Sequence, residues 1–458
     1  MTKARNISDL LDANGDVKSA ALDNVPASDN ASALTTGTLP DARLSNQVKQ
    51  VKGTSAPGSP QGGDLWFDTN TGINLLKVYN SVVSNWVATN VTAPIITSNT
   101  GIESGIASNI TLNGSAFSTG QGVLSFTPSG GSASTVNVTP SSNTSLTVAV
   151  PSAIYGQSAG TVIAVTFQND AGLTSGVSNI TITETIGGTK VISGGYAYHT
   201  FTSSGNFILA GQKNIEYLII AGGGAAGSYA GGGGAGGLIS GTKNNISAAT
   251  YSIVVGAGGT NPSGIGSTQA TGGDGSNSTA LSETAIGGGG GADGGDNGRD
   301  GGSGGGSSYA NVSSGGSGTA GQGNDGGTSS RANPFASAGG GGKGSAGSAA
   351  ASNTHAGAGG SGDNSFSTWA TATSTGDSGL YAGGGGGGVS AGGSYTGGGV
   401  AGAAGSGGGG AGGVGGSGMS AGDANTGGGG GGGGYNGVSN IYSPKNGGSG
   451  IVILKYAV

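Results

Sequence analysis

Residues 427–458 read GGGGGGGGYNGVSNIYSPKNGGSGIVILKYAV, a run of eight glycines followed by a polar loop and an apolar strand. The segment from Ile451 to Tyr456 has the β-branched and aromatic residues typical of strands. Similar strand patterns precede the glycine-rich stretch, at residues 196–209, 215–224, 236–240 and 250–259. Strands thus bracket the glycine tract, and we expect the terminal strand to pair with the early ones and close one domain over residues 187–458.

The glycine tract itself admits two interpretations. Glycine loses more conformational entropy on folding than any other residue, so a flexible linker is one of them. The other is a bundle of polyglycine-II helices, which have three residues per turn and no internal hydrogen bonds, and which bond to one another side by side. The bracketing strands and the polar loops between runs favour the bundle. The runs are 231–234, 287–291, 339–342, 383–388, 407–410 and 427–434.

The composition excludes several classes of protein. The chain has 458 residues, of which 110 are glycine and only 8% are charged, so it departs from an ordinary globular enzyme. It lacks the strict glycine triplet and abundant proline of collagen. The net charge of −6, with no basic stripe, argues against nucleic acid as a partner. Without cysteine the chain has no disulfide framework. The first basic residues are not followed by the apolar core of a secretory signal peptide, so we do not expect secretion. A virion protein that is released by cell lysis fits this expectation.

The part before residue 187 has three modules. Only 18 of the 110 glycines precede Gly187. Residues 1–52 have short apolar segments that cannot bury themselves in a monomer, and we expect them to attach to a virion partner or to oligomerise. They allow a short helix from Ser8 to Leu11. Residues 53–90 predict a small β-hairpin module anchored by Trp66, Tyr79 and Trp86. Residues 91–186 show alternating strands at regular spacing, typical of an immunoglobulin-like β-sandwich spacer.

Three sequence phrases resemble proteins of bacteriophage particles. ASALTTGTLPDARL resembles a motif near the virion-proximal end of tail fibres, and GDLW…DT…LKVYN…W resembles modules of marine phage virion proteins. The order of strand, GGGGAGG, YSIVVGAGG and terminal GGSGIVILKY is similar to phage glycine-rich proteins and to the receptor-binding adhesins of T-even-like phages. The resemblance implies polyglycine-II helices that present loops to a bacterial receptor. The predicted fold is therefore all-β, modular and elongated, ending in a β-framed glycine-rich tip domain.

The loops between the glycine runs contain most of the large side chains of this domain. Aromatic residues and arginine dominate binding hot spots, so we assign them as receptor-binding candidates. The alternative is that these side chains cap the rods or pack on other chains of an oligomer. The candidates are Tyr309, Arg331, Phe335, His355, Phe366, Trp369, Tyr381, Tyr395, Tyr435 and Tyr442.

Catalytic, metal and cofactor sites have little support in the sequence. The two histidines, His199 and His355, lie in different contexts, and no pair of carboxylates stands out. Asp293, Asp296 and Asp300 match no calcium-loop spacing, and a solvated loop is the expectation for them. We therefore predict no enzyme activity, no metal and no cofactor.

The function expected from these features is attachment of a phage tail fibre to a host outer-membrane protein or surface glycan, by a homotrimer on the virion surface. The alternative is a head or tail decoration fibre whose glycine bundle is purely structural. An ice-binding protein is a third class, but it favours regular G-x-x triplets, which are absent.

Overall fold

The computed structural model describes residues 50–69, 75–82, 84–89, 92–229, 231–261, 270–309, 313–329, 335–390, 398–434 and 444–458. The predicted helix at Ser8–Leu11 lies outside the described residues, as do most of residues 1–52. The chain divides into two compact units, 1–92 and 93–458. No described helix is long and apolar enough to cross a membrane.

The described part of the first unit is a four-stranded sheet in the order β1-β2-β3-β4. Trp66 is buried, and its ring packs edge-on against Trp86 at 5.7 Å between centroids. Tyr79 contacts the same Trp86 ring at 5.5 Å. The three predicted aromatic anchors are therefore confirmed. The strands are β1 (Gln50–Gly53), β2 (Leu65–Asp68), β3 (Leu75–Asn80) and β4 (Asn85–Ala88).

The second unit begins with the predicted sandwich. One sheet has the order β11-β10-β7-β8 and the other β5-β6-β9. Inward side chains of both sheets form one core, in which Phe117 packs edge-on against Phe167. The elements are β5 (Ile95–Asn99), β6 (Asn109–Ser115), β7 (Gly122–Pro128), β8 (Ser134–Val138), β9 (Ser145–Ala149), α2 (Ser152–Tyr155), β10 (Val162–Gln168) and β11 (Ser178–Thr181).

A five-stranded sheet frames the glycine-rich domain, in the order β12-β13-β20-β15-β16. The terminal strand β20 is central and antiparallel to both β13 and β15, which confirms the predicted return of the chain. Smaller pairs, β14 with β17 and β18 with β19, complete the frame. The elements are β12 (Thr189–Ser193), β13 (Tyr196–Phe201), β14 (Gly205–Leu209), β15 (Lys213–Ile220), β16 (Leu238–Ile246), β17 (Ala249–Ile253), β18 (Ser278–Ala280), β19 (Glu283–Ala285), α3 (Ser367–Thr373) and β20 (Ile451–Ala457).

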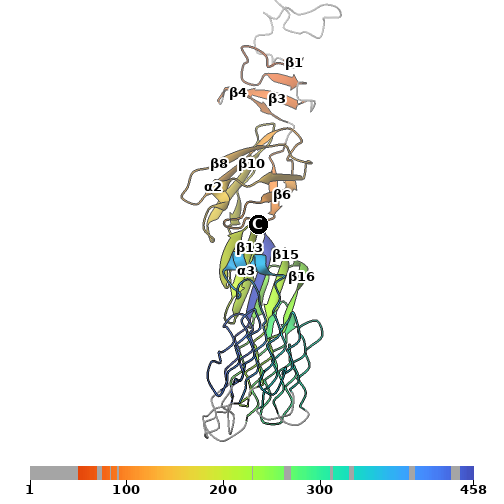
Figure 1. Cartoon of the computed structure of the whole chain (residues 1–458). Coiled ribbons are helices and arrows are strands. Elements are labelled where there is room, and N and C mark those ends of the chain that lie inside the picture. The colour runs from red at the N-terminus through yellow and green to blue at the C-terminus, as the bar shows by residue number, and fades with distance from the viewer. Residues whose placement is uncertain are drawn as a thin grey trace, which may run out of the picture. The chain divides into compact units, whose positions relative to one another are not determined.

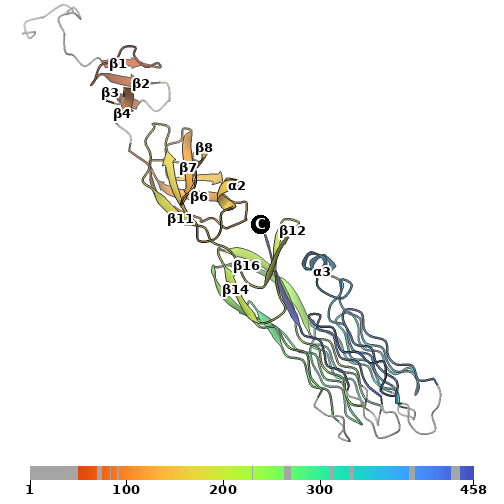
Figure 2. The same ribbon diagram turned by 90° about the vertical axis from the view of Figure 1, so that its left-hand side faces the viewer.

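Beyond this sheet, the chain continues into a bundle of extended glycine rods, shown at the bottom of Figure 1 and the lower right of Figure 2. The rod of residues 231–237 lies inside the bundle, and every third amide of it donates to the same neighbour. Gly231, Gly234 and Gly237 donate to residues 286–292, Gly232 and Ala235 to residues 338–341, and Gly233 and Gly236 to residues 427–430.

The carbonyl groups of this rod face three other neighbours. They accept hydrogen bonds from residues 221–227, from residues 303–306 and from Gly385. One rod thus bonds to six others, and the repeat of three residues is the one expected of a polyglycine-II helix. The flexible-linker interpretation is wrong for this rod and the neighbours to which it bonds.

Glycine is required at many positions of these rods because a neighbouring backbone lies where the Cβ of any other residue would be. A Cβ on Gly232 would overlap the carbonyl oxygen of Gly385, and one on Gly233 would overlap that of Gly224. A buried glycine costs about 0.5–1 kcal/mol of extra entropy relative to alanine. A hydrogen bond contributes about 0.5–1.5 kcal/mol net. Roughly one lattice bond per residue is therefore comparable to this extra entropy cost of glycine relative to alanine.

A first prediction concerns the substitution Gly233→Ala. The added methyl group would displace the backbone at Gly224, so we expect the free energy of unfolding to fall by at least about 2 kcal/mol. Gly211→Ala is the control, because a Cβ at Gly211 meets nothing within 4 Å, and its effect should stay below about 1 kcal/mol. Denaturant unfolding of the two variants measures the difference. Equal stability would contradict the close packing of the rods.

Candidate binding site at the ends of the glycine rods

Three aromatic side chains meet where rods end on the side away from the sheet. Tyr229 precedes the rod 231–237, Tyr309 follows residues 303–308, and Phe335 precedes residues 336–342. The ring centroids of Tyr229 and Tyr309 are 5.8 Å apart, and those of Tyr309 and Phe335 are 4.5 Å apart. Each side chain is half-buried, so part of each remains accessible. We call these three residues the aromatic group.

The backbone of Phe335 is strained. Its φ is +70°, a left-handed conformation that a bulky side chain rarely adopts. Such strain costs on the order of 1–3 kcal/mol and persists where the surroundings hold it. Here the carbonyl of Phe335 accepts a hydrogen bond from the amide of Ser390 at 3.2 Å. The chain thus retains an aromatic residue at a position that would suit glycine or asparagine.

Asp293 lies beneath the aromatic group and is only 2% exposed. Its Oδ1 accepts a hydrogen bond from the amide of Tyr229 at 2.9 Å. Burial raises the pKa of Asp293 to about 6, and the negative charge of Asp296 acts in the same direction. Burial also raises the pKa of Tyr309. The expected solvated loop is wrong for Asp293, because its carboxyl group caps the backbone before a rod.

His355 belongs to the same end of the bundle. The amide of Gly357, two residues later, donates to the carbonyl of Ser337, and the hydroxyl of Ser337 donates to the carbonyl of Tyr229 at 3.1 Å. The side chain of His355 is exposed, and its Nδ1 lies 2.9 Å from Oγ1 of Thr354. Because Nδ1 is held by this local contact, the other ring nitrogen, Nε2, can form a hydrogen bond with a ligand.

Trp369 and Tyr381 do not belong to this site. Trp369 is 7% exposed and Tyr381 is fully buried, both in the core between the sheet and the rods. Trp369 packs edge-on against Tyr198, and the Tyr381 hydroxyl lies 2.6 Å from Oγ1 of Thr375. Their assignment as loop binding residues is therefore wrong. Each ring lies close to the apolar face of the sheet, and burying its apolar surface there is favourable in free energy.

Phe366 is half-buried beside Trp369, with ring centroids 5.6 Å apart. It lies near Leu238, which directly follows the rod 231–237, whereas Tyr229 precedes that rod. The seven residues of this rod span about 22 Å at ~3.1 Å per residue. The structure thus separates the described candidates into two groups at opposite ends of the rods. Tyr309, Phe335 and His355 lie at one end.

The remaining candidates, Arg331, Tyr395, Tyr435 and Tyr442, lie outside the described residues. Tyr229 was not among the candidates that the sequence indicated. It lies just before a glycine run, in GSYAGGGG. An aromatic residue next to a glycine run is the sequence pattern that would have indicated it.

The chemistry available at this end is recognition by aromatic faces, phenol hydroxyls and an imidazole edge. Within the described ranges, no group of three or more histidine, aspartate or glutamate side chains is arranged to hold a metal ion.

A second prediction concerns the pH dependence of stability. The pKa of Asp293 is raised from 3.8 to about 6, so the folded chain binds this proton more tightly than the unfolded chain. The contribution of Asp293 is therefore most favourable below about pH 4 and declines as the pH rises to about 6. Asp293→Asn keeps the Oδ1 acceptor and removes the ionisation. The stability of this variant relative to the wild type should increase by roughly 2 kcal/mol between pH 4 and pH 7.

Denaturant unfolding at several pH values measures this effect. Asp300→Asn serves as a control, because Asp300 is an exposed aspartate that also accepts a backbone hydrogen bond. Parallel stability curves for wild type and Asp293→Asn would contradict the prediction.

The chain was compared with protein families, with proteins of curated function and with solved structures. No protein of curated function matches the chain. One similar solved structure comes from a study of host cell surface retention of a 1.5-MDa bacterial ice-binding adhesin, with 15% identity and a TM-score of 0.18. The match covers 39% of this chain and 66% of that one, just under two thirds of its length. A family described as a glycine-rich domain matches residues 200–457, more than half of the chain, and to this family the protein belongs.

Proposed function

We propose that this protein is an adhesin of a phage particle that attaches the particle to a bacterial surface. The observation that carries the proposal is the aromatic group, held in place by the hydrogen-bonded rods. A rigid scaffold lowers the entropy lost on binding, because the contacting side chains are ordered beforehand. The strained backbone of Phe335 also supports a binding role, since strain of this kind concentrates at functional positions.

The proposed partner is a host outer-membrane protein or surface glycan. Tyrosine rings combine a large apolar face with a polar hydroxyl and have few rotatable bonds, which suits adaptable recognition. His355 adds an exposed polar edge at the same end of the rods. The site binds its receptor reversibly and breaks no bond in it.

The location on the virion surface, the attachment through residues 1–52 and the homotrimeric state are parts of the same proposal. They are supported by the resemblance of ASALTTGTLPDARL to virion-proximal motifs of tail fibres. Several copies on one particle would turn weak single contacts into strong attachment, because each later contact forms at a high effective concentration.

The test measures binding of the fluorescently labelled full chain to a panel of Gram-negative bacteria and to their outer-membrane vesicles. We expect saturable binding to at least one strain. Tyr309→Ala and Phe335→Asn should weaken it by about tenfold or more, as for interface hot spots. Asparagine at position 335 tolerates the left-handed backbone, so this variant removes the ring without adding strain.

Tyr196→Ala is the matched control, because Tyr196 is an accessible tyrosine at the sheet end of the domain. Its binding should equal that of the wild type. A chain that gold-labelled antibodies locate on virions but that binds none of the strains would instead support a structural decoration fibre.

A further inference from the structure

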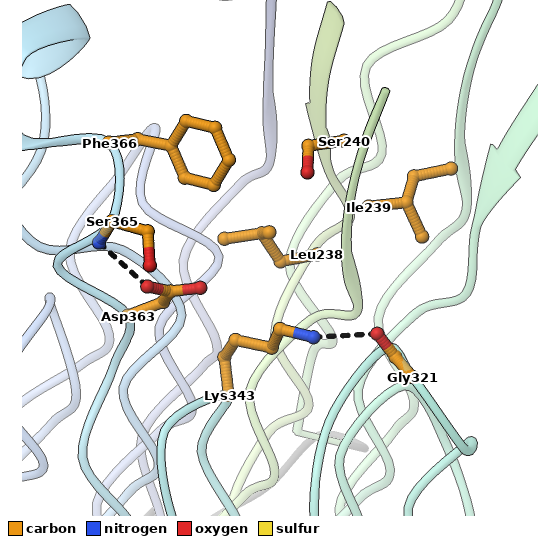
Figure 3. A pocket seen from close by; sticks show the side chains of 8 residues that line it. All are labelled: Leu238, Ile239, Ser240, Gly321, Lys343, Asp363, Ser365 and Phe366. Carbon is orange, nitrogen blue, oxygen red and sulfur yellow. Dashed lines mark hydrogen bonds between the residues drawn. The ribbon is translucent and has the colours of Figure 1, made fainter. Parts of the chain in front are cut away.

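A pocket lies at the sheet end of the rods, opposite to the aromatic group. It is formed between the edge strand β16 and the segment that leads into α3, and its volume is about 320 Å³ (Figure 3). This size is at the lower end of the range of about 300–1,000 Å³ for small-molecule sites. Its lining residues are Leu238, Ile239, Ser240, Gly321, Lys343, Asp363, Ser365 and Phe366.

One wall presents a hydrogen-bond acceptor held in a fixed position. The backbone of Asp363 exchanges two hydrogen bonds with that of Tyr381, at 2.9 and 3.2 Å, and Tyr381 is fully buried. Oδ1 of Asp363 accepts a hydrogen bond from the amide of Ser365 at 2.7 Å. Within the described part of the chain, Oδ2 has no such partner and is available to a ligand.

Lys343 provides a donor to the same pocket. Its backbone amide bonds to the carbonyl of Ala382 at 2.9 Å, and its Nζ donates to the carbonyl of Gly321 at 2.6 Å. An ammonium group has three donors, so two remain. Among the described residues, Lys343 and Asp363 form no ion pair with each other or with any other side chain. Figure 3 shows the two side chains pointing to different sides of the pocket.

The pocket also has an apolar surface. The ring of Phe366 points into it and toward Leu238, which is almost fully buried (Figure 3). Phe366 is held by its edge-on contact with Trp369 at 5.6 Å between centroids. This contact orients the ring before any ligand binds, and the exposed residue Ser240 lies on the other side of the pocket (Figure 3).

We propose that this pocket binds a neutral saccharide of one or two sugar units. A pyranose ring has an apolar C–H face, which suits Phe366, and a rim of hydroxyl groups that both donate and accept. Oδ2 of Asp363 accepts from one hydroxyl, and Nζ of Lys343 donates to another. A phosphate or carboxylate ligand fits less well, because the Asp363 carboxylate repels it. The proposal is independent of the adhesion proposed above, which depends on the opposite end of the rods.

The test is saturation-transfer NMR and calorimetric titration of the full chain with glucose, galactose, mannose and N-acetylglucosamine. We expect saturable binding of at least one of them in the millimolar range or tighter. Asp363→Asn keeps the acceptor for the Ser365 amide, and Phe366→Leu keeps an apolar contact with Trp369. Each should raise the Kd about tenfold, as for one lost directional contact. Asp363→Asn should leave the unfolding temperature unchanged, and Phe366→Leu should lower it by only a few degrees, because one aromatic pair is worth about 0.5–1.5 kcal/mol.

Asp300→Asn is the control, because Asp300 also accepts a backbone amide hydrogen bond but does not line this pocket. Its Kd should match that of the wild type. The proposal is overturned if none of the four sugars binds saturably. It is equally overturned if Asp363→Asn and Phe366→Leu bind the sugar as tightly as Asp300→Asn does.

Discussion

The structure of the glycine-rich domain depends on one interaction, the hydrogen bond between backbones of adjacent rods. In the rod 231–237 these bonds point to six neighbours in turn, and no side chain is needed between them. Most globular domains differ in this respect, because the burial of apolar side chains supplies most of the free energy that drives their folding. The price in chain entropy is high for glycine. The bundle is therefore stable only as a whole, because an isolated rod would have no partners for its amides.

The five-stranded sheet supplies the apolar side-chain packing that the glycine rods lack. Strand β20 contributes side chains to clusters on both of its faces, with Leu454 and Tyr456 on one and Ile451 and Ile453 on the other. These clusters fix the ends of the rods that enter and leave the sheet. A conventional hydrophobic core thus fixes one end of an unconventional lattice made mostly of glycine, and the two kinds of packing are joined through residues such as Ala235 and Tyr381.

The sequence allowed prediction of the all-β class, the three aromatic anchors of the first module and the pairing of the terminal strand. These depend on local patterns, which a sequence displays directly. It did not separate Trp369 and Tyr381 from Tyr309 and Phe335, because all four lie between glycine runs. Such a ring is buried if its loop lies at the sheet end of the rods and more accessible if its loop lies at the opposite end. Which end a loop occupies depends on the direction of each rod, and that direction is set only in the assembled bundle. The burial of Asp293 was hidden for the same reason.

The central place of β20 also affects when this domain can form. Strands β13 and β15 both pair with β20, which is synthesised some 230 residues after the end of β15. Throughout that interval the nascent segment is mostly glycine, serine and alanine, which gives chaperones and neighbouring chains little apolar surface to hold. The hairpins β12–β13 and β15–β16 can pair as soon as they are synthesised, but only β20 joins them into one five-stranded sheet, so the sheet is completed after translation of residue 457.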